Sequence, residues 1–92
     1  VSPDEDSSEE AESARRYARL LISEIRLYNE ATVEAGQKAR DLLARLKPQI
    51  DRARRLYEER VPASARARAD FFGQELIRTL ANGDATLLGQ GT

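Results

Sequence analysis

Apolar side chains recur at alternating intervals of three and four residues from Ala11 to Leu56, and no other feature constrains the fold as much. The stripe consists of Ala11, Ala14, Ala18, Leu21, Ile25, Tyr28, Thr32, Ala35, Ala39, Leu42, Leu46, Gln49, Ala53 and Leu56. Only Thr32 and Gln49 are polar among these positions. Because this spacing keeps one side of an α-helix turned toward a neighbouring helix, it predicts amphipathic helices that associate.

Local signals predict where the first helices begin and end. Ser7 and Glu10 have the spacing of a capping box, so a helix should start there. Gly36 is the first possible stop. The next helical stretch, residues 37–60, contains Pro48, which removes a backbone donor and clashes with the preceding turn. Either the helix kinks at Pro48 or a new helix begins there.

A third helix is expected near the C-terminus. Ser64 can cap a helix over residues 65–81, and Asn82 with Gly83 tolerates the left-handed backbone that ends one. Residues 84–92 form a flexible tail, whose two leucines either fold back onto the helices or serve as a docking peptide.

The charge pattern separates the N-terminus from the rest. Residues 1–12 contain six acidic and no basic side chains, although the whole chain has a net charge of only −1. We therefore divide the chain into an acidic disordered linker end at 1–6, a helical domain at 7–83 and the tail at 84–92. Because the chain begins at Val1, we expect it to be a piece of a longer protein.

Gly36 decides between two shapes. The stripe stays in step across Gly36, which favours one continuous rod of about fifty residues. Leu43, Ile50 and Tyr57 lie beside the stripe, however, and a wider apolar side is typical of a helix with more than one neighbour. We therefore expect an all-α fold in which long helices form a helical hairpin or small bundle with coiled-coil character, plus a shorter C-terminal helix.

Three segments carry a resemblance to a known kind of domain. They read RYARLLISEIRLYNE at 16–30, LARLKPQIDRARRLYEERV at 43–61 and ADFFGQELIRTLANGDATLLG at 69–89. The chain resembles the C-terminal helical accessory modules of multidomain bacterial signalling and regulatory proteins. The resemblance implies a cytoplasmic interaction module, and it supplies no catalytic residues.

The composition argues against catalysis. The chain has no histidine and no cysteine, the side chains most often used for acid–base and nucleophilic chemistry. Glu30 and Glu34 share a helix side, but carboxylates on a helix exterior are usually solvated surface. We expect no enzyme activity, no catalytic residue, no cofactor and no metal site. No apolar run approaches the roughly 18 residues of a membrane span, so no membrane partner is expected.

Protein interaction or oligomerisation is the function that the stripe predicts, with a homodimer as the expected partner state and another protein as a second possibility. The interaction seam is assigned to Leu21, Ile25, Tyr28, Leu42, Leu46 and Leu56. The third helix is expected to pack, or to fill a partner's groove, through Phe71, Phe72, Leu76 and Leu80. The same residues could instead form an intramolecular core, and the pattern leaves both interpretations open.

Nucleic-acid binding is the alternative function. Residues 38–68 contain ten basic and four acidic side chains. A helix surface of that charge can contact phosphates, with Arg52, Arg54 and Arg55 as the candidate contacts. The chain has no base-reading motif, and its overall charge is slightly acidic, so this alternative ranks second.

Overall fold

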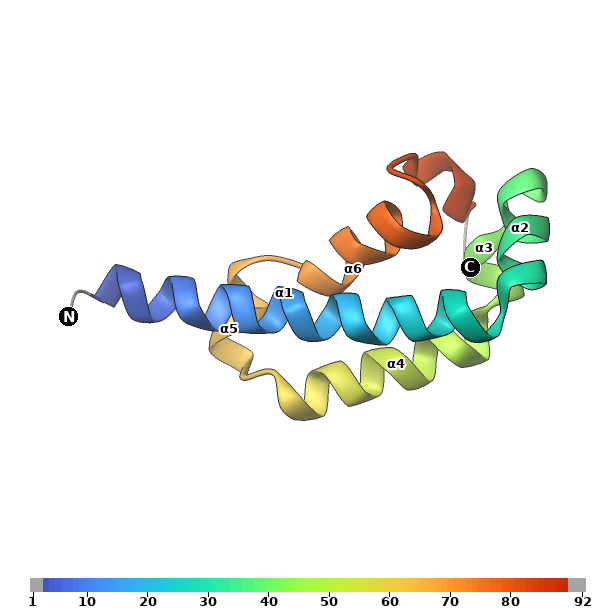
Figure 1. Ribbon diagram of the computed structural model, residues 1–92. Helices are drawn as coiled ribbons and strands as arrows, with labels where there is room; N and C mark the ends of the chain where they lie inside the picture. Colours follow the sequence, from blue (N-terminus) through green and yellow to red (C-terminus); the bar gives the residue numbers. More distant parts are fainter. Residues whose placement is uncertain (1–2, 90–92) are drawn as a thin grey trace.

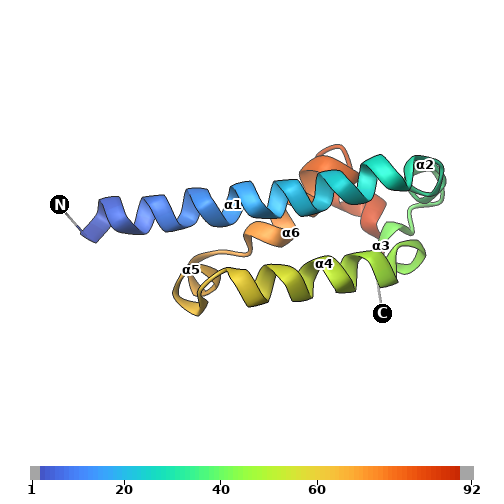
Figure 2. The same ribbon diagram turned by 60° about the horizontal axis from the view of Figure 1, so that its bottom comes forward.

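Two antiparallel helices form the body of the molecule. The computed structural model describes the backbone of residues 3–89 and the side chains of residues 9–89. Helix α1 (Pro3–Tyr28, 26 residues) and helix α4 (Lys47–Arg60, 14 residues) lie side by side and run in opposite directions (Figures 1 and 2). At the far end of α1, helices α2 (Glu30–Ala39) and α3 (Leu42–Arg45) make the connection between them.

The C-terminal third of the chain covers the α1–α4 pair. Helix α5 (Ala63–Arg68) turns the chain, α6 (Phe71–Glu75) packs on α1, and a π-helical turn, η1 (Leu76–Leu80), continues α6 along α1. A 3₁₀ helix, η2 (Ala85–Leu88), ends the described chain against α2 and α3 (Figure 1). The regular structure of residues 3–89 is therefore entirely helical, which confirms the all-α prediction.

The predicted hairpin of long coiled-coil helices is not confirmed. Apart from α1, the helices have 4 to 14 residues. The first break comes at Asn29, whose side-chain Nδ2 donates to the Ile25 carbonyl at 2.9 Å. An asparagine that bonds the carbonyl four residues earlier competes with the backbone donor of the helix, so α1 ends at Tyr28. The start also differs, because α1 begins at Pro3, a residue suited to a first helical position, rather than at Ser7.

Gly36 does not stop a helix. It lies inside α2, which ends at Ala39 and is followed by Arg40 in the left-handed conformation (φ 58°). The Arg40 and Asp41 backbone N–H groups are both directed to the Gly36 carbonyl. A Cβ at Gly36 would lie 2.7 Å from Cδ2 of Leu42. The absence of a side chain therefore allows α2 and α3 to approach each other closely.

The later helix boundaries follow local chemistry. Pro48 lies in the first turn of α4, so of the two alternatives at this proline the structure shows a new helix. The expected third helix over 65–81 is split, because Ala69 is extended and Asp70 caps α6 by accepting from the Gly73 N–H at 2.9 Å. The predicted stop is confirmed, since Asn82 and Gly83 both have positive φ.

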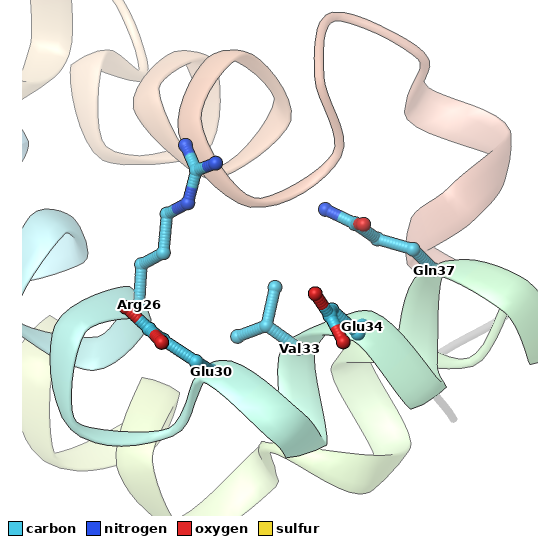
Figure 3. A pocket seen from close by; sticks show the side chains of 5 residues that line it. All are labelled: Arg26, Glu30, Val33, Glu34 and Gln37. Carbon is cyan, nitrogen blue, oxygen red and sulfur yellow. The ribbon is translucent and has the colours of Figure 1, made fainter.

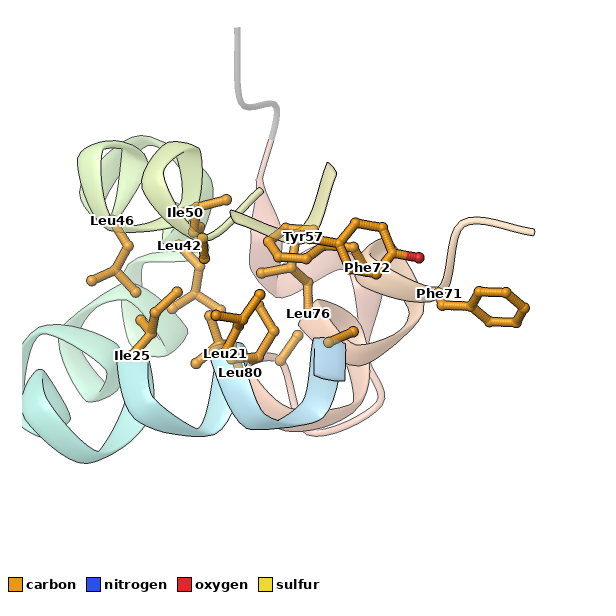
Figure 4. Packing of buried hydrophobic residues seen from close by; sticks show 14 of the residues in the cluster. Leu21, Ile25, Leu42, Leu46, Ile50, Tyr57, Phe71, Phe72, Leu76 and Leu80 are labelled. Atoms are coloured by element: carbon orange, nitrogen blue, oxygen red, sulfur yellow. The ribbon is translucent and has the colours of Figure 1, made fainter. Parts of the chain in front are cut away.

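One hydrophobic core lies between α1, α4 and the α6–η1 segment. Its largest fully buried apolar side chains are Phe72, Ile22, Leu42, Leu46 and Leu80, and Figure 4 shows several of the core residues converging from α1, α3, α4 and α6. Of the two roles considered for the leucines near the C-terminus, the structure shows folding back onto the helices. Leu87 and Leu88 of η2 are half-buried against this core, and residues 90–92 lie outside the described residues.

No helix of the described chain is both long and apolar enough to span a membrane.

Candidate interaction surface

The residues of the predicted interaction seam divide into two groups. Four are buried in the core of the single chain: Leu21, Ile25, Leu42 and Leu46. The other two remain on the surface, with Tyr28 exposing 78% of its area and Leu56 exposing 42%. The intramolecular interpretation therefore describes four of the six seam residues, and Tyr28 and Leu56 remain open to a partner.

The third-helix residues belong to the core. Phe71, Phe72, Leu76 and Leu80 are each at most 4% exposed. Phe72 packs against Tyr57 of α4 with ring centroids 5.5 Å apart (Figure 4). Of the two roles considered for these residues, the structure shows intramolecular packing.

A shallow groove of about 210 Å³ runs between α1 and α4, and both Tyr28 and Leu56 line it. Leu21 and Ile25 of α1 and Ala53 of α4 contribute its apolar lining. The other lining residues are Glu24, Tyr28, Asn29, Gln49, Arg52 and Leu56. Gln49 Oε1 is buried and has no hydrogen-bond partner, so the groove combines an apolar floor with a few polar groups.

Helix α1 presents three different sides along its length. Arg15, Arg19 and Arg26 lie on the side that contacts α6 and η1, and the core residues Leu21 and Ile25 lie on the side toward α4. A third stripe consists of Leu20, Glu24 and Leu27, whose spacings of four and three residues place them on one side of the helix. All three are exposed, with Leu20 at 54% and Leu27 at 62%.

Glu24 belongs to the third stripe and also lines the groove, so the stripe borders the groove. We call the two together the α1–α4 face. It comprises Leu20, Glu24, Leu27 and Tyr28 of α1 with Gln49, Arg52 and Leu56 of α4. Leu20, Leu27, Tyr28 and Leu56 are all the large apolar residues that are exposed in the described part of the chain. Their collection on one face, rather than singly over the surface, is typical of an interaction site.

The candidate phosphate contacts do not converge. Arg52 lines the groove, Arg55 is exposed, and the Arg54 guanidinium stacks over the Phe72 ring at 4.7 Å. Neighbouring basic groups are also engaged within the chain, since Arg45 makes two 3.0 Å hydrogen bonds to Asp41. The basic segment therefore does not build a single cationic surface from the three predicted residues.

A second hollow, of about 280 Å³, is polar and is lined by Arg26, Glu30, Val33, Glu34 and Gln37 (Figure 3). Gln37 Nε2 donates to the Leu80 carbonyl at 2.7 Å, and Arg26 donates to the Thr79 carbonyl at 3.4 Å. These carbonyls belong to the last residues of η1, where a helix leaves acceptors without intrahelical donors. Arg26 and Gln37 therefore attach the end of η1 to α1 and α2. Glu30 and Glu34 also line the hollow and are exposed, as expected of surface carboxylates.

Sequence reasoning missed several structural contacts. Besides Arg54, Arg15 stacks over Phe71 at 5.3 Å and Arg60 over Tyr17 at 4.9 Å, so three Arg–aromatic contacts link α1, α4 and α6. The exposed stripe was also missed, although the Leu20–Glu24–Leu27 spacing was available as a signal.

The sequence pattern also gave no sign that the carboxylate of Glu75 is buried and contacts Arg19. The Glu75 side chain is 3% exposed, and Oε2 lies 3.9 Å from Nε of Arg19. The Thr79 hydroxyl donates to the same oxygen at 3.5 Å.

A scan against protein-family models and searches of curated proteins and of solved structures found no match to this chain.

Proposed function

We propose that this chain is a non-catalytic protein-interaction module that self-associates through the α1–α4 face. The observation that carries the proposal is the gathering of Leu20, Leu27, Tyr28 and Leu56 beside an apolar groove. As part of the same proposal, the chain belongs to a cytoplasmic bacterial regulatory protein, because its sequence resembles the accessory modules of such proteins. A non-catalytic role agrees with a chain that has neither histidine nor cysteine.

The exposed apolar area sets the expected strength of association. Complete burial of a large apolar side chain contributes about 1.5–3 kcal/mol, and these four are already partly covered, so roughly 1 kcal/mol remains for each. A symmetric dimer buries the face twice, giving on the order of 8 kcal/mol. Association costs about 4–15 kcal/mol in lost freedom of motion and side-chain ordering. With the smallest of these costs about 4 kcal/mol remains, so we expect a weak dimer with a Kd near 1 mM.

Solution mass as a function of protein concentration tests this function. Sedimentation equilibrium from about 10 μM to 1 mM should show a monomer at low concentration and a rising fraction of dimer toward 1 mM. Leu27→Asp should remain monomeric throughout, because it places a charge in an apolar interface. Its circular dichroism should match that of the wild type, since Leu27 is 62% exposed and outside the core.

A matched control places the same charge elsewhere. Gln74 is exposed on α6, the helix that packs on a different side of α1, so Gln74→Asp should dimerise like the wild type. A wild type that stays monomeric at 1 mM contradicts self-association. If mass instead rises only with added duplex DNA at low salt, the nucleic-acid alternative replaces it.

A further inference from the structure

The α1–α4 face carries opposite charges on its two helices. Glu24 of α1 and Arg52 of α4 line the same groove. Each lies near the middle of the stretch of its own helix that lines the groove, so in the antiparallel pair the two residues lie at about the same level. Leu56, one turn from Arg52, shares the groove with Leu21, the neighbour of Leu20. The face thus presents a row of Leu20, Glu24 and Leu27 beside a row of Leu56, Arg52 and Gln49.

Two symmetric arrangements bring this face against a second copy of itself with the helices of the two copies aligned. With a two-fold axis along the helices, α1 of each copy lies on α4 of the other. With a two-fold axis across the helices, α1 lies on α1 and α4 lies on α4. Both arrangements are isologous, so every contact occurs twice or lies on the axis.

The charges distinguish the two arrangements. When α1 lies on α4, Glu24 meets Arg52 of the second copy twice, and Leu20 meets Leu56. When α1 lies on α1 and the interface is centred on the groove, Glu24 meets Glu24 and Arg52 meets Arg52. Like charges placed opposite each other in an interface suppress association, so the charge pattern is self-complementary in the first arrangement only.

We propose that the occupant of the α1–α4 face is a second copy of this chain, bound with α1 of each copy antiparallel to α4 of the other and with Glu24 paired to Arg52 across the interface. The product is an antiparallel four-helix assembly with two such ion pairs. The arrangement rests on the self-association proposed above and adds to it the identity of the facing helices.

Charge reversal and mixing test this arrangement. Glu24→Arg alone and Arg52→Glu alone each create two like-charge contacts, and each variant should dimerise about tenfold or more weakly than the wild type. An equimolar mixture of the two variants should form a heterodimer of wild-type affinity. In that heterodimer the introduced arginine of one chain faces the introduced glutamate of the other, and the unchanged Arg52 faces the unchanged Glu24. Native mass spectrometry separates this heterodimer from both homodimers by mass.

The controls isolate contacts within one chain. The double variant Glu24→Arg with Arg52→Glu should also dimerise like the wild type, but this result alone is equally expected if the two residues interact only across their own groove. Rescue by mixing cannot arise that way, because each chain in the mixture still carries two like charges. Circular dichroism of each variant should be unchanged, since both residues are exposed.

Each outcome has a definite consequence. Heterodimer rescue together with two weakened homodimers supports the arrangement. If the wild type dimerises and mixing does not rescue the variants, the arrangement is wrong and self-association stands. Preferential pairing of Glu24→Arg with the wild type would identify the α1-on-α1 arrangement instead. A wild type that is monomeric at 1 mM removes both this arrangement and the proposed function.

Discussion

Tyr57→Phe should stabilise the protein, which is the opposite of the usual result of deleting a hydrogen-bonding group. Tyr57 is 4% exposed, and its ring packs against Phe72. Its hydroxyl is buried without a hydrogen-bond partner. A buried unsatisfied polar group costs about 1–3 kcal/mol, so removing the oxygen while keeping the ring should raise the free energy of unfolding by about 1 kcal/mol.

Urea denaturation followed by circular dichroism measures this change. With a slope of about 1–3 kcal/mol per molar urea, the midpoint should rise by roughly 0.5 M. The melting temperature should rise by about 4–8 °C, as expected for a domain of this size. Both should be measured at low micromolar protein, so that association makes no contribution. Tyr28→Phe is the matched control and should change stability by less than about 0.5 kcal/mol, because Tyr28 is 78% exposed.

The difference between wild type and variant should also depend on pH. Burial raises the pKa of Tyr57 above its ordinary value, and the nearby negative charge of Asp70 raises it further, against the opposing charges of Arg66 and Arg54. The unfolded state therefore loses the Tyr57 proton first, and wild-type stability declines as pH rises above about 10. Tyr57→Phe lacks this contribution, so its advantage should grow above that pH. A Tyr57→Phe protein that is less stable than wild type at pH 7 would mean that the hydroxyl has a partner, and it would refute the reasoning.

Three further changes test other parts of the structure. Leu46→Asp should abolish the cooperative thermal transition seen by circular dichroism, because it places a charge at a fully buried core position; a folded monomer would mean that Leu46 faces outward. Gly36→Val should lower stability by about 1–3 kcal/mol in urea denaturation, since the new side chain overlaps Leu42, whereas unchanged stability would show that α2 and α3 can separate freely. The Thr86 hydroxyl and backbone N–H hydrogen bonds lower the pKa of Asp84; in Thr86→Val that pKa, followed by NMR titration, should rise toward its ordinary value, and no change would mean that the hydroxyl bond is absent in solution.

The local sequence determined much of the secondary structure. The three-and-four spacing required amphipathic helices, and most of its positions from Leu21 to Ala53 are buried or half-buried. Pro48 started a helix because proline suits a first turn, and Asn82 with Gly83 ended one because both tolerate positive φ. These helix starts and ends depend only on a residue and its near neighbours, so they can be predicted without knowledge of the tertiary structure.

Other helix ends depended on competition between side-chain and backbone hydrogen bonds or on packing, which the spacing of apolar residues does not reveal. Asn29 ended α1 because its side chain bonded the Ile25 carbonyl, whereas Gly36, the more obvious stop, stayed helical where Leu42 packs against it. Asp70 started a separate helix inside the stretch expected to be continuous. In each case the helical and broken conformations differ by about 1 kcal/mol locally, so packing decides between them.

Only the tertiary structure decided which apolar side chains remain available to a partner. A helical stripe has the same spacing whether it packs against its own chain or another chain, so the sequence could not separate core from interface. The α6–η1 segment covers one side of the α1–α4 pair and completes the core around Leu21 and Leu46. The opposite stripe, with Leu20 and Leu27, has no segment of the described chain over it and is exposed. The sequence alone therefore determined that the helices are amphipathic, and the position of the last third of the chain determined which of their sides faces outward.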